Sequence, residues 1–353
     1  MKVRNMNNLI AANVNAMEGY TPGEQPQFTD VVKLNTNENP YPPSPAVGAA
    51  LASFDVASLR RYPDPMAGAV RRRIAEIHSC PVECVFAGNG SDEVLALAVK
   101  CFAHDGGSVG AFDPTYSLYP VLAEIRNVSY ISTPLSEDFS WQEPADDFRP
   151  DIFFLTNPNA PTGIAYAHDK IEAFCNRFEG VVLIDEAYAD FADGNCMDLA
   201  VRPDNRNVIV SRTLSKSFSL AGIRFGYCIG PAELIEAMYK VKDSYNLDAI
   251  TQAVALAALN DLEYMQTNAK KICMDRDALS EKLKSRGWSC TESRTNFLFA
   301  RPPKGNAAEI FAKLKEHHVF VRYFPARKTA AYLRISIGTP EENSRLLKVL
   351  DTI

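Results

Sequence analysis

The sequence predicts an α/β protein in which a large domain on a mostly parallel sheet precedes a smaller α+β domain. Three observations support this fold class. Apolar runs such as Val181–Ile184 have no polar face, which is typical of strands buried on both sides of a parallel sheet. Segments with helical patterns separate these runs. From about residue 268 the pattern changes to a long helix followed by closely spaced strands.

The chain of 353 residues is long enough for one large and one small domain. We expect an N-terminal arm and loop over residues 1–45, a large domain over 46–245 and a small domain over 246–353. A polar stretch, Asp243–Asp248, interrupts a long helical region close to the second boundary.

The expected elements follow one another in regular order. In the arm and the large domain we expect strands at 31–34, 85–87, 107–112, 151–156, 181–184, 208–210 and 226–230. Helical patterns lie between them at 45–54, 66–79, 94–99 and 231–265. In the small domain we expect helices at 268–286 and 306–317, and strands at 296–300, 319–324 and 332–337. Residues 136–150 are acidic and polar with two prolines, which predicts a surface loop.

The composition excludes some classes of function. The net charge of −6 argues against a nucleic-acid-binding surface. No segment approaches the apolar length of a membrane span, and residues 1–15 lack the compact apolar core of a signal peptide. The eight cysteines form no Cys-x-x-Cys pair, and we find no ligand set for a metal. We therefore expect reduced cysteines in a cytoplasmic protein without a metal.

Three charged residues follow two of the predicted strands. Asp185 comes at the exit of a buried strand, which places it at the carboxyl edge of the sheet, where open α/β folds bind ligands. Lys216 follows the next strand among hydroxyls and small residues, and Arg224 comes eight positions later. This combination suits a cofactor with an aldehyde, a phosphate and a basic ring nitrogen, and pyridoxal 5'-phosphate has all three.

Each residue type has a task in that chemistry. A lysine amine such as that of Lys216 forms a Schiff base with the aldehyde and is displaced by an incoming amino group. An acid must hold the ring nitrogen protonated so that the ring accepts electrons, and Asp185 can do this. Tyr188, three residues later, can donate a hydrogen bond to the ring's phenolic oxygen.

The phosphate of the cofactor needs donors of its own. Thr213, Ser215 and Arg224 are suitable, and the arginine can bind in bidentate fashion. Lys216 alone would be interpreted as a surface lysine near a helix start. Its compatible spacing with the acid, the tyrosine and the arginine favours the cofactor site instead.

Three motifs in this region carry a family resemblance. They are Asp-Glu-Ala-Tyr at Asp185–Tyr188, Ser-x-Thr-Leu-Ser-Lys-Ser-Phe at Ser211–Phe218 and Gly-x-Arg-x-Gly at Gly222–Gly226. Together they resemble the signature of fold type I pyridoxal-phosphate aminotransferases. The resemblance runs from about residue 31 to 340, with the motifs in family order. It implies that fold, that cofactor and transamination.

The loop after the first predicted strand has a motif of its own. Asn35–Tyr41 reads Asn-x-Asn-Glu-Asn-Pro-Tyr, and the four prolines of residues 35–45 exclude a helix or a central strand. A linker between arm and core is one interpretation. The motif resembles that of histidinol-phosphate aminotransferases and their near relatives, where this loop lines the substrate side. That implies substrate-binding roles for Asn37 and Tyr41, although Pro42 stands where the family often has glycine.

A glycine-bearing turn precedes the helix predicted at 94–99. Such a turn exposes free N–H groups and the positive end of the helix dipole, which makes an anion site. Plain capping by Ser91 or Asp92 explains the same residues. The family resemblance assigns Gly90, Ser91 and Asp92 to the cofactor phosphate.

The resemblance implies three further cofactor contacts. Tyr116 in Pro-Thr-Tyr would stack on the pyridine ring, although a core tyrosine after a turn is the alternative. Tyr62 in Arg-Tyr-Pro-Asp-Pro would reach the cofactor phosphate of a neighbouring subunit, which implies a homodimer. The family usually has asparagine directly before Pro-Thr-Gly, bound to the phenolic oxygen. Ala160 stands there in this chain, and we assign that role to Asn159, one residue earlier.

Two arginines of the small domain are candidates for substrate anions. Arg334 lies in an apolar strand, where a buried arginine is costly without a partner. The residues alone favour a salt bridge within the protein, whereas the resemblance assigns Arg334 to the substrate α-carboxylate. Arg322 could hold a second anion, such as a substrate phosphate.

The leading hypothesis is transamination of L-histidinol phosphate with 2-oxoglutarate, which yields glutamate, in histidine biosynthesis. An aromatic amino acid aminotransferase is an alternative of the same class, because substrate choice depends on side-chain geometry around the site. A phosphothreonine decarboxylase of the same fold is an alternative from another class. A non-catalytic regulator with a pyridoxal domain would need an added DNA-binding region, for which we expect no room before residue 31.

Overall fold

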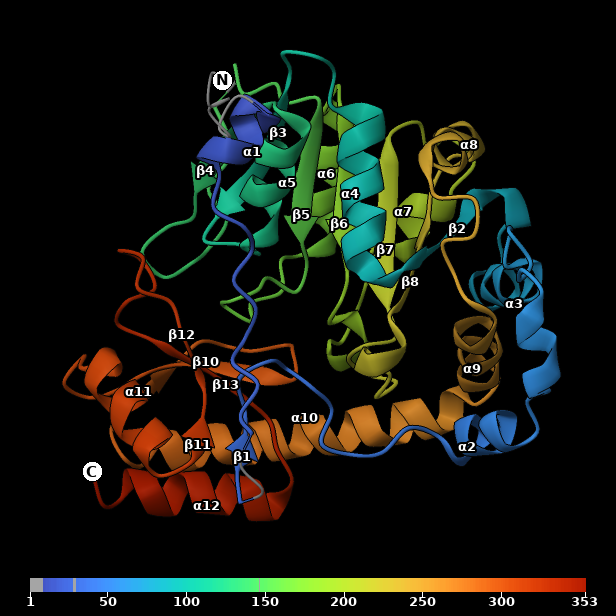
Figure 1. Cartoon of the computed structure of the whole chain (residues 1–353). Coiled ribbons are helices and arrows are strands. Elements are labelled where there is room, and N and C mark those ends of the chain that lie inside the picture. Colours follow the sequence, from blue (N-terminus) through green and yellow to red (C-terminus); the bar gives the residue numbers. More distant parts are fainter. Residues whose placement is uncertain (1–8, 28–29, 146) are drawn as a thin grey trace, which may run out of the picture.

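The computed structural model describes residues 9–27, 30–145 and 147–353. Parts of the predicted arm and of the predicted surface loop, residues 1–8, 28–29 and 146, lie outside the described residues. Figure 1 shows a large sheet with helices on both faces in the upper part of the view, and a smaller unit below it. The long helix α10 (Leu262–Lys284) runs along the lower unit toward the helices on the opposite side.

The large sheet of the described chain has seven strands in the order β2-β8-β7-β6-β5-β3-β4. They are β2 (Val85–Asn89), β3 (Ser108–Asp113), β4 (Ser129–Pro134), β5 (Ile152–Thr156), β6 (Val181–Asp185), β7 (Val208–Thr213) and β8 (Phe225–Ile229). β8 pairs antiparallel with β2 and β7, and the other neighbours pair in parallel. The predicted fold class, with its mostly parallel sheet, is confirmed.

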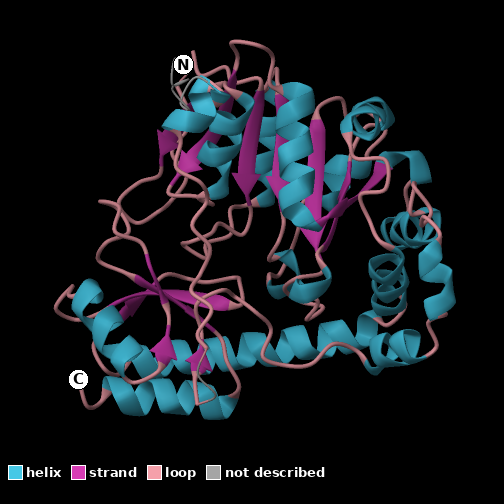
Figure 2. Ribbon diagram, in the orientation of Figure 1, coloured by secondary structure: helices cyan, strands magenta, loops and turns pink. Residues whose placement is uncertain are grey.

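Both faces of this sheet are covered by helices, which explains its unbroken apolar runs. Ile152 and Phe154 of β5 pack on one face, and Phe153 and Leu155 pack on the other. The first face is covered by α4 (Gly90–Phe102), α5 (Leu118–Arg126) and α8 (Ala232–Val241). The second is covered by α3 (Gly68–His78), α6 (His168–Arg177), α7 (Met197–Val201) and α9 (Ala249–Leu259), and Figure 2 shows the resulting layers.

The lower unit combines two small sheets with three helices. An antiparallel sheet has the order β12-β13-β10-β9, and β1 of the arm pairs in parallel with β11. The strands are β1 (Val32–Lys33), β9 (Ser289–Cys290), β10 (Phe297–Arg301), β11 (Val319–Phe320), β12 (Arg322–Tyr323) and β13 (Leu333–Ser336). Helices α10, α11 (Ala307–Glu316) and α12 (Pro340–Leu350) pack against them around one apolar core.

The described N-terminal residues also form the α-helices α1 (Ala12–Ala16) and α2 (Pro45–Ala52). Helix α2 packs against α9, and α9 shares the core of the large sheet. The arm therefore contributes β1 to the lower unit and leads into the upper one. The division at residues 45 and 245 stays a prediction.

Two features of the large sheet differ from the sequence-based picture. Strand β4 was not expected, because its polar sequence at the sheet edge gives no apolar run. The predicted surface loop after it contributes Phe139 and Trp141 to the core, with exposed fractions of 2% and 6%. Trp141 packs edge-on against Phe112, with ring centroids 4.6 Å apart. Isolated aromatics in an acidic stretch carry no periodicity that would predict this burial.

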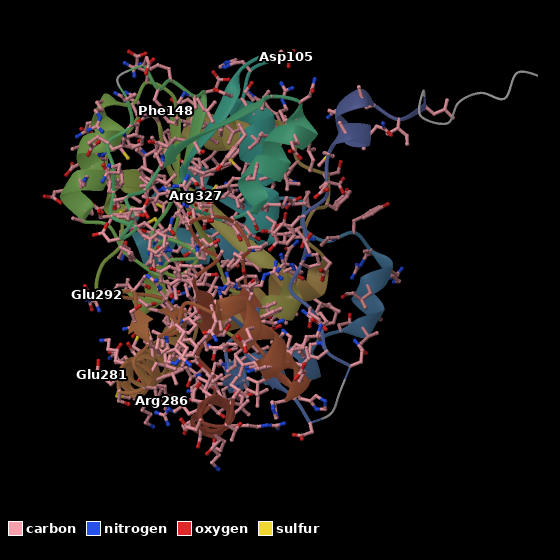
Figure 3. All side chains as sticks on the ribbon, turned by 90° about the vertical axis from the view of Figure 1, so that its left-hand side faces the viewer. Asp105, Phe148, Glu281, Arg286, Glu292 and Arg327 are labelled. Carbon is pink, nitrogen blue, oxygen red and sulfur yellow. The ribbon has the colours of Figure 1, made fainter. Side chains whose placement is uncertain are left out.

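A view from the side relates the two units along the outer surface. Figure 3 shows Asp105 and Phe148 on the upper unit and Glu281 and Arg286 on the lower unit. Arg327, from the segment between β12 and β13, lies between them. The next residue, Lys328, donates to the carbonyl oxygen of Leu135 in the upper unit at 2.5 Å. Within the described ranges, no helix is both long and apolar enough to cross a membrane.

A buried ion network braces the carboxyl ends of β6 and β7. Arg212 of β7 donates from Nε to Oε2 of Glu186 at 2.9 Å and from Nη1 to Oδ1 of Asp190 at 2.9 Å. Asp190 belongs to the short 3₁₀ helix η4 (Ala189–Phe191) and also accepts from Ser217 Oγ. The network therefore links the residue after Asp185 to the loop after β7.

Replacing Arg212 should destabilise the protein strongly. Arg212→Met leaves two carboxylates without their cation, and losing one partner of a buried pair costs about 3–5 kcal/mol. We expect a large drop in the thermal unfolding midpoint. The control Arg286→Met breaks an exposed pair with Asp351 and should leave the midpoint close to that of the wild type. Equal midpoints for the two variants would contradict the bracing role.

Candidate active site

A cavity of about 270 Å³ lies at the carboxyl ends of the parallel strands of the large sheet. Its walls come from the arm, the loop after β1, the start of α4, the ends of β5, β6 and β7, and strands β12 and β13. Twelve residues that the sequence singled out line it: Asn37, Ser91, Asp92, Tyr116, Asp185, Tyr188, Thr213, Ser215, Lys216, Arg224, Arg322 and Arg334. The structure thus brings together residues from positions 37 to 334.

Gly90 and Asn159 lie beside the cavity without lining it. Gly90 has a φ of +78°, and a Cβ there would lie 2.7 Å from Nη2 of Arg224. Asn159 is buried; its Oδ1 accepts from Thr162 Oγ1 at 2.9 Å and its Nδ2 donates to the carbonyl oxygen of Pro114 at 3.3 Å. In this arrangement Asn159 holds the Pro-Thr-Gly turn together. Its predicted contact with the cofactor stays a prediction.

Tyr41 and Tyr62 are not brought to the cavity of this single chain. The hydroxyl of Tyr41 donates to Oδ2 of Asp275 at 3.2 Å, and the residue lines a separate hollow against α10. Tyr62 is 79% exposed, and its ring stacks on that of Tyr245 at 4.3 Å between centroids. A role for Tyr62 in the site requires a second subunit.

Asp185 is a buried carboxylate without a cation beside it in the described part of the chain. It lies at the end of β6, where it accepts from the hydroxyl of Tyr119 at 2.9 Å and from the N–H of Ala187 at 3.2 Å. Burial raises its pKa to about 6, although both hydrogen bonds oppose this rise. The group is therefore suited to a cationic partner supplied by a ligand.

Tyr119 is a site residue that the sequence did not predict. It is buried in α5, three residues after Tyr116, and its hydroxyl also pairs with Oγ1 of Thr156 at 2.6 Å. The only signal was its spacing of almost one helical turn from a predicted site residue. Burial raises the pKa of its hydroxyl well above the usual range, so it remains a proton donor to the carboxylate.

Lys216 is held by its backbone and leaves its amine free to move. Its Nζ donates to the carbonyl oxygen of Thr36 at 3.2 Å and lies 5.8 Å from the ring centroid of Tyr188. Asn39 donates from Nδ2 to the carbonyl oxygens of Lys216 and Ser217, both at 3.1 Å. The loop after β1 thus anchors the lysine, a function that the motif alone did not reveal.

The start of α4 and Arg224 form an anion cradle. The helix begins at Gly90, and the side chain of its N-cap residue makes no capping hydrogen bond. Nη2 of Arg224 lies 3.0 Å from Oδ2 of Asp92, and Nη1 lies 3.4 Å from Oγ of Ser215. Thr213 Oγ1 donates to the same Ser215 oxygen at 2.9 Å. Free N–H groups, two hydroxyls and a guanidinium thus converge, as a phosphate requires.

Arg334 and Arg322 make a second anion site on the opposite wall. Arg334 is partly buried, and its guanidinium lies 5.3 Å from the ring centroids of both Phe297 and Phe324. Its Nη2 donates to the carbonyl oxygen of Asn35 at 3.0 Å, and its Nε has no partner among the described residues. The salt bridge that the residues alone favoured does not occur there. Burial lowers the pKa of Arg334, and an incoming anion would relieve that cost.

The N-terminal arm covers this second site. Arg322 donates from Nη1 and Nη2 to the carbonyl oxygens of Pro22 and Thr21, at 3.2 and 3.0 Å. Tyr20 lines the cavity, and its ring centroid lies 6.0 Å from that of Tyr116. The sequence predicted only an arm here, since these contacts depend on residues 300 positions away.

The residues present fit the cofactor that the sequence predicts. A carboxylate without a cation matches a protonated ring nitrogen, and the cradle at α4 matches a phosphate. The amine of Lys216 and the hydroxyl of Tyr188 belong to residues that line the same cavity.

Comparison with known proteins agrees with this geometry. Residues 29–350 match the family described as aminotransferase class I and II. A histidinol-phosphate aminotransferase from Microcystis aeruginosa is 42% identical to this chain over 334 residues, which is 95% of each chain.

Two solved structures show the same fold. That of histidinol-phosphate aminotransferase from Sinorhizobium meliloti in complex with pyridoxal-5'-phosphate has a TM-score of 0.82, 23% identity and 91% coverage of each chain. L-threonine-O-3-phosphate decarboxylase from Porphyromonas gingivalis has a TM-score of 0.81 and 21% identity, covering 91% of this chain and 99% of that one. At these identities the likeness concerns the fold and does not select between the two activities.

The unpaired charge of Asp185 should reduce the stability of the cofactor-free protein. Its folded pKa of about 6 exceeds the usual 3.8, so the ionised form opposes folding above pH 6 and the cost disappears as the pH falls below 4. Asp185→Asn should therefore raise the free energy of unfolding at pH 8 by about 2–3 kcal/mol, with the gain closing in acid.

The measurement is thermal or urea unfolding of both proteins between pH 4 and 8. Asp190→Asn is the matched control, because its carboxylate has a cation partner in Arg212 and its loss should destabilise. If Asp185→Asn does not raise the free energy of unfolding at pH 8, or if the increase grows as the pH falls, the unpaired state of Asp185 is contradicted.

Proposed function

This chain belongs to the aminotransferase class I and II family, and on that premise we propose that it transfers an amino group between L-histidinol phosphate and 2-oxoglutarate. One observation carries the chemistry: Lys216, the unpaired Asp185 and two separate anion sites line one cavity. The substrate follows from the relative that is 42% identical over almost the whole chain. The reaction belongs to histidine biosynthesis.

The cofactor of this reaction is pyridoxal 5'-phosphate. When bound, it supplies an aldehyde that holds the amino group and a ring that accepts the electron pair released from the donor carbon. Asp185 would hold the proton on the ring nitrogen, and Tyr188 would donate to the phenolic oxygen. Ser215, Arg224 and the first turn of α4 would hold the phosphate. Thr213 would support Ser215 through their hydrogen bond.

Lys216 would act as the proton carrier at the donor carbon. Its amine has only the carbonyl oxygen of Thr36 as a hydrogen-bond partner among the described residues, so little holds it back. Asn39 binds the carbonyl oxygens of Lys216 and of the residue after it, and the Ser217–Asp190 contact holds that next residue. The amine can therefore swing between positions while its attachment stays in place.

The second anion site would serve both substrates in turn. Histidinol phosphate has no α-carboxylate, so its phosphate would occupy the site of Arg334 and Arg322 in one half-reaction. In the other half-reaction a carboxylate of glutamate would bind Arg334. A partly buried guanidinium without a carboxylate partner in the described chain can accept either anion.

A donor panel tests the substrate. The cofactor-loaded protein receives 2-oxoglutarate and either histidinol phosphate, phenylalanine, tyrosine or phosphothreonine, and glutamate and carbon dioxide are measured together. We expect glutamate from histidinol phosphate with a kcat/KM at least about tenfold above that of the aromatic donors.

Replacing the lysine tests its role as proton carrier. Lys216→Arg, which keeps the positive charge, should lower the rate of glutamate formation by about a thousandfold or more.

The other outcomes of the panel identify the alternatives. Comparable or faster turnover of the aromatic donors would make this an aromatic amino acid aminotransferase. Carbon dioxide from phosphothreonine without glutamate would make it a decarboxylase and would overturn transamination. The histidinol-phosphate aminotransferase that is 42% identical to this chain favours histidinol phosphate as the donor over both alternatives.

The working unit proposed here is a homodimer in which Tyr62 binds the cofactor phosphate of the partner subunit. Support comes from the exposure of Tyr62 and from large apolar side chains that are exposed near it in the chain. They are Leu51, Val56, Leu59 and Met66.

The Tyr62 hydroxyl should contribute to cofactor affinity. Tyr62→Phe should raise the cofactor Kd about tenfold or more, the value of one hydrogen bond to a charged group, while sedimentation shows an unchanged dimer. Tyr245→Phe, which alters its stacking neighbour, is the control and should leave the Kd unchanged. A monomeric wild type, or equal Kd values for Tyr62→Phe and wild type, would refute this arrangement.

A cytoplasmic location also belongs to this proposal. Its support is the set of eight free cysteines, which suits a reducing compartment.

A further inference from the structure

Asn37 has a hydrogen-bond partner for each of its polar groups. Its backbone N–H donates to Oγ of Ser336 at 2.9 Å, and its Oδ1 accepts from that same hydroxyl at 2.9 Å. Its carbonyl oxygen accepts from Nδ2 of Asn296 at 2.9 Å. Its own Nδ2 donates to the hydroxyl oxygen of Tyr188 at 2.9 Å. With 1% of its surface exposed, Asn37 is a structural centre of the site.

The orientation of the Asn37 amide follows from its contact with Ser336. The serine hydroxyl has one hydrogen, and its oxygen already accepts the backbone N–H of Asn37. It therefore needs an acceptor, which Oδ1 provides. A reversed amide would place a second N–H against the serine oxygen and leave the hydroxyl hydrogen without an acceptor. The amide nitrogen must therefore face Tyr188.

This orientation decides the role of the Tyr188 hydroxyl. An amide nitrogen only donates, so the oxygen of Tyr188 accepts from Asn37 and the hydroxyl hydrogen remains available. Tyr188 lines the cavity together with Asn37. Its hydrogen can then be directed to a ligand instead of being used within the protein.

We propose that Asn37 is a positioning residue that keeps Tyr188 a hydrogen-bond donor toward the phenolic oxygen of the cofactor. The inference rests on the proposed function, because it needs pyridoxal phosphate in the cavity. The substrate contact predicted for Asn37 stays a prediction beside this role. A donor at that oxygen favours its anionic form, and this lowers the pKa of the lysine–cofactor linkage.

The same residue ties Tyr188 to the strand of the second anion site. Ser336 follows Arg334 by two residues on β13, while Tyr188 follows β6 of the large sheet. Asn37 itself has a φ of +56°, a left-handed conformation that asparagine and aspartate tolerate better than other side chains. The position therefore admits few substitutions, and aspartate is the informative one.

Asn37→Asp tests the proposal because it preserves shape and reverses the hydrogen bond. A carboxylate only accepts, so it should draw the Tyr188 hydrogen away from the cofactor. We expect the pKa of the lysine–cofactor linkage to rise by about one to two units, the value of a hydrogen bond to a charged group. The readout is visible absorbance against pH, without substrate.

A double-mutant cycle separates this effect from the added negative charge. If Asn37 acts through the Tyr188 hydroxyl, Asn37→Asp should shift the linkage pKa in the wild type and cause little further shift in a Tyr188→Phe background. A shift that persists in full in that background, or one absent from the single variant, would overturn the proposal. Thermal unfolding checks that Asn37→Asp, Tyr188→Phe and the double variant all fold.

A matched control and a separate criterion complete the test. Asn127→Asp makes the same substitution at another left-handed position, with φ of +61°, at the end of α5, and should leave the spectrum unchanged. The spectrum does not depend on the identity of the substrate. A wild type that forms no lysine–cofactor linkage would refute the proposed function itself, and the role of Asn37 would fall with it.

Discussion

The carboxylate of Asp185 is buried at the end of β6, and the described chain places no cation beside it. The ionised form of such a group is costly until a ligand supplies the positive charge. Across the cavity, Arg334 is partly buried with no carboxylate partner in the described chain, so the opposite wall favours an anion. Lys216 lies on the same cavity. The protein thus folds around two unbalanced charges of opposite sign, and the cofactor and substrate are the groups that balance them.

The large sheet places these charges, and the loop after β1 fixes their geometry. Parallel strands bring their carboxyl ends to one edge, which is why Asp185 and the residues after β7 meet although about 30 positions separate them. Alternate asparagines of the loop then take different tasks. Asn35 accepts from Arg334 through its carbonyl oxygen, Asn37 holds Tyr188, and Asn39 holds the backbone of Lys216. One short segment therefore sets the positions of groups on both sides of the cavity.

The sequence was sufficient where a site residue follows a buried apolar run. Asp185 and Lys216 could be placed at the sheet edge because strand ends of a parallel sheet share that edge. It was insufficient where a role depends on long-range partners. Tyr119 reaches Asp185 from a helix far earlier in the chain. Strand β4 was not predicted either, because its sequence is polar and a strand at the edge of a sheet needs no apolar run. Local pattern fixes the strand ends, whereas hydrogen-bond partners depend on how the elements pack.

Infrared difference spectroscopy of the Asp185 carboxyl tests the central claim most directly. Subtracting the spectrum of Asp185→Asn from that of the wild type isolates this group across a pH titration. The unbalanced charge predicts a carboxyl that titrates near pH 6 in cofactor-free protein and stays ionised down to a clearly lower pH once pyridoxal phosphate is bound. An ordinary titration near pH 4 without the cofactor, or a protonated carboxyl at neutral pH with it, would contradict the account.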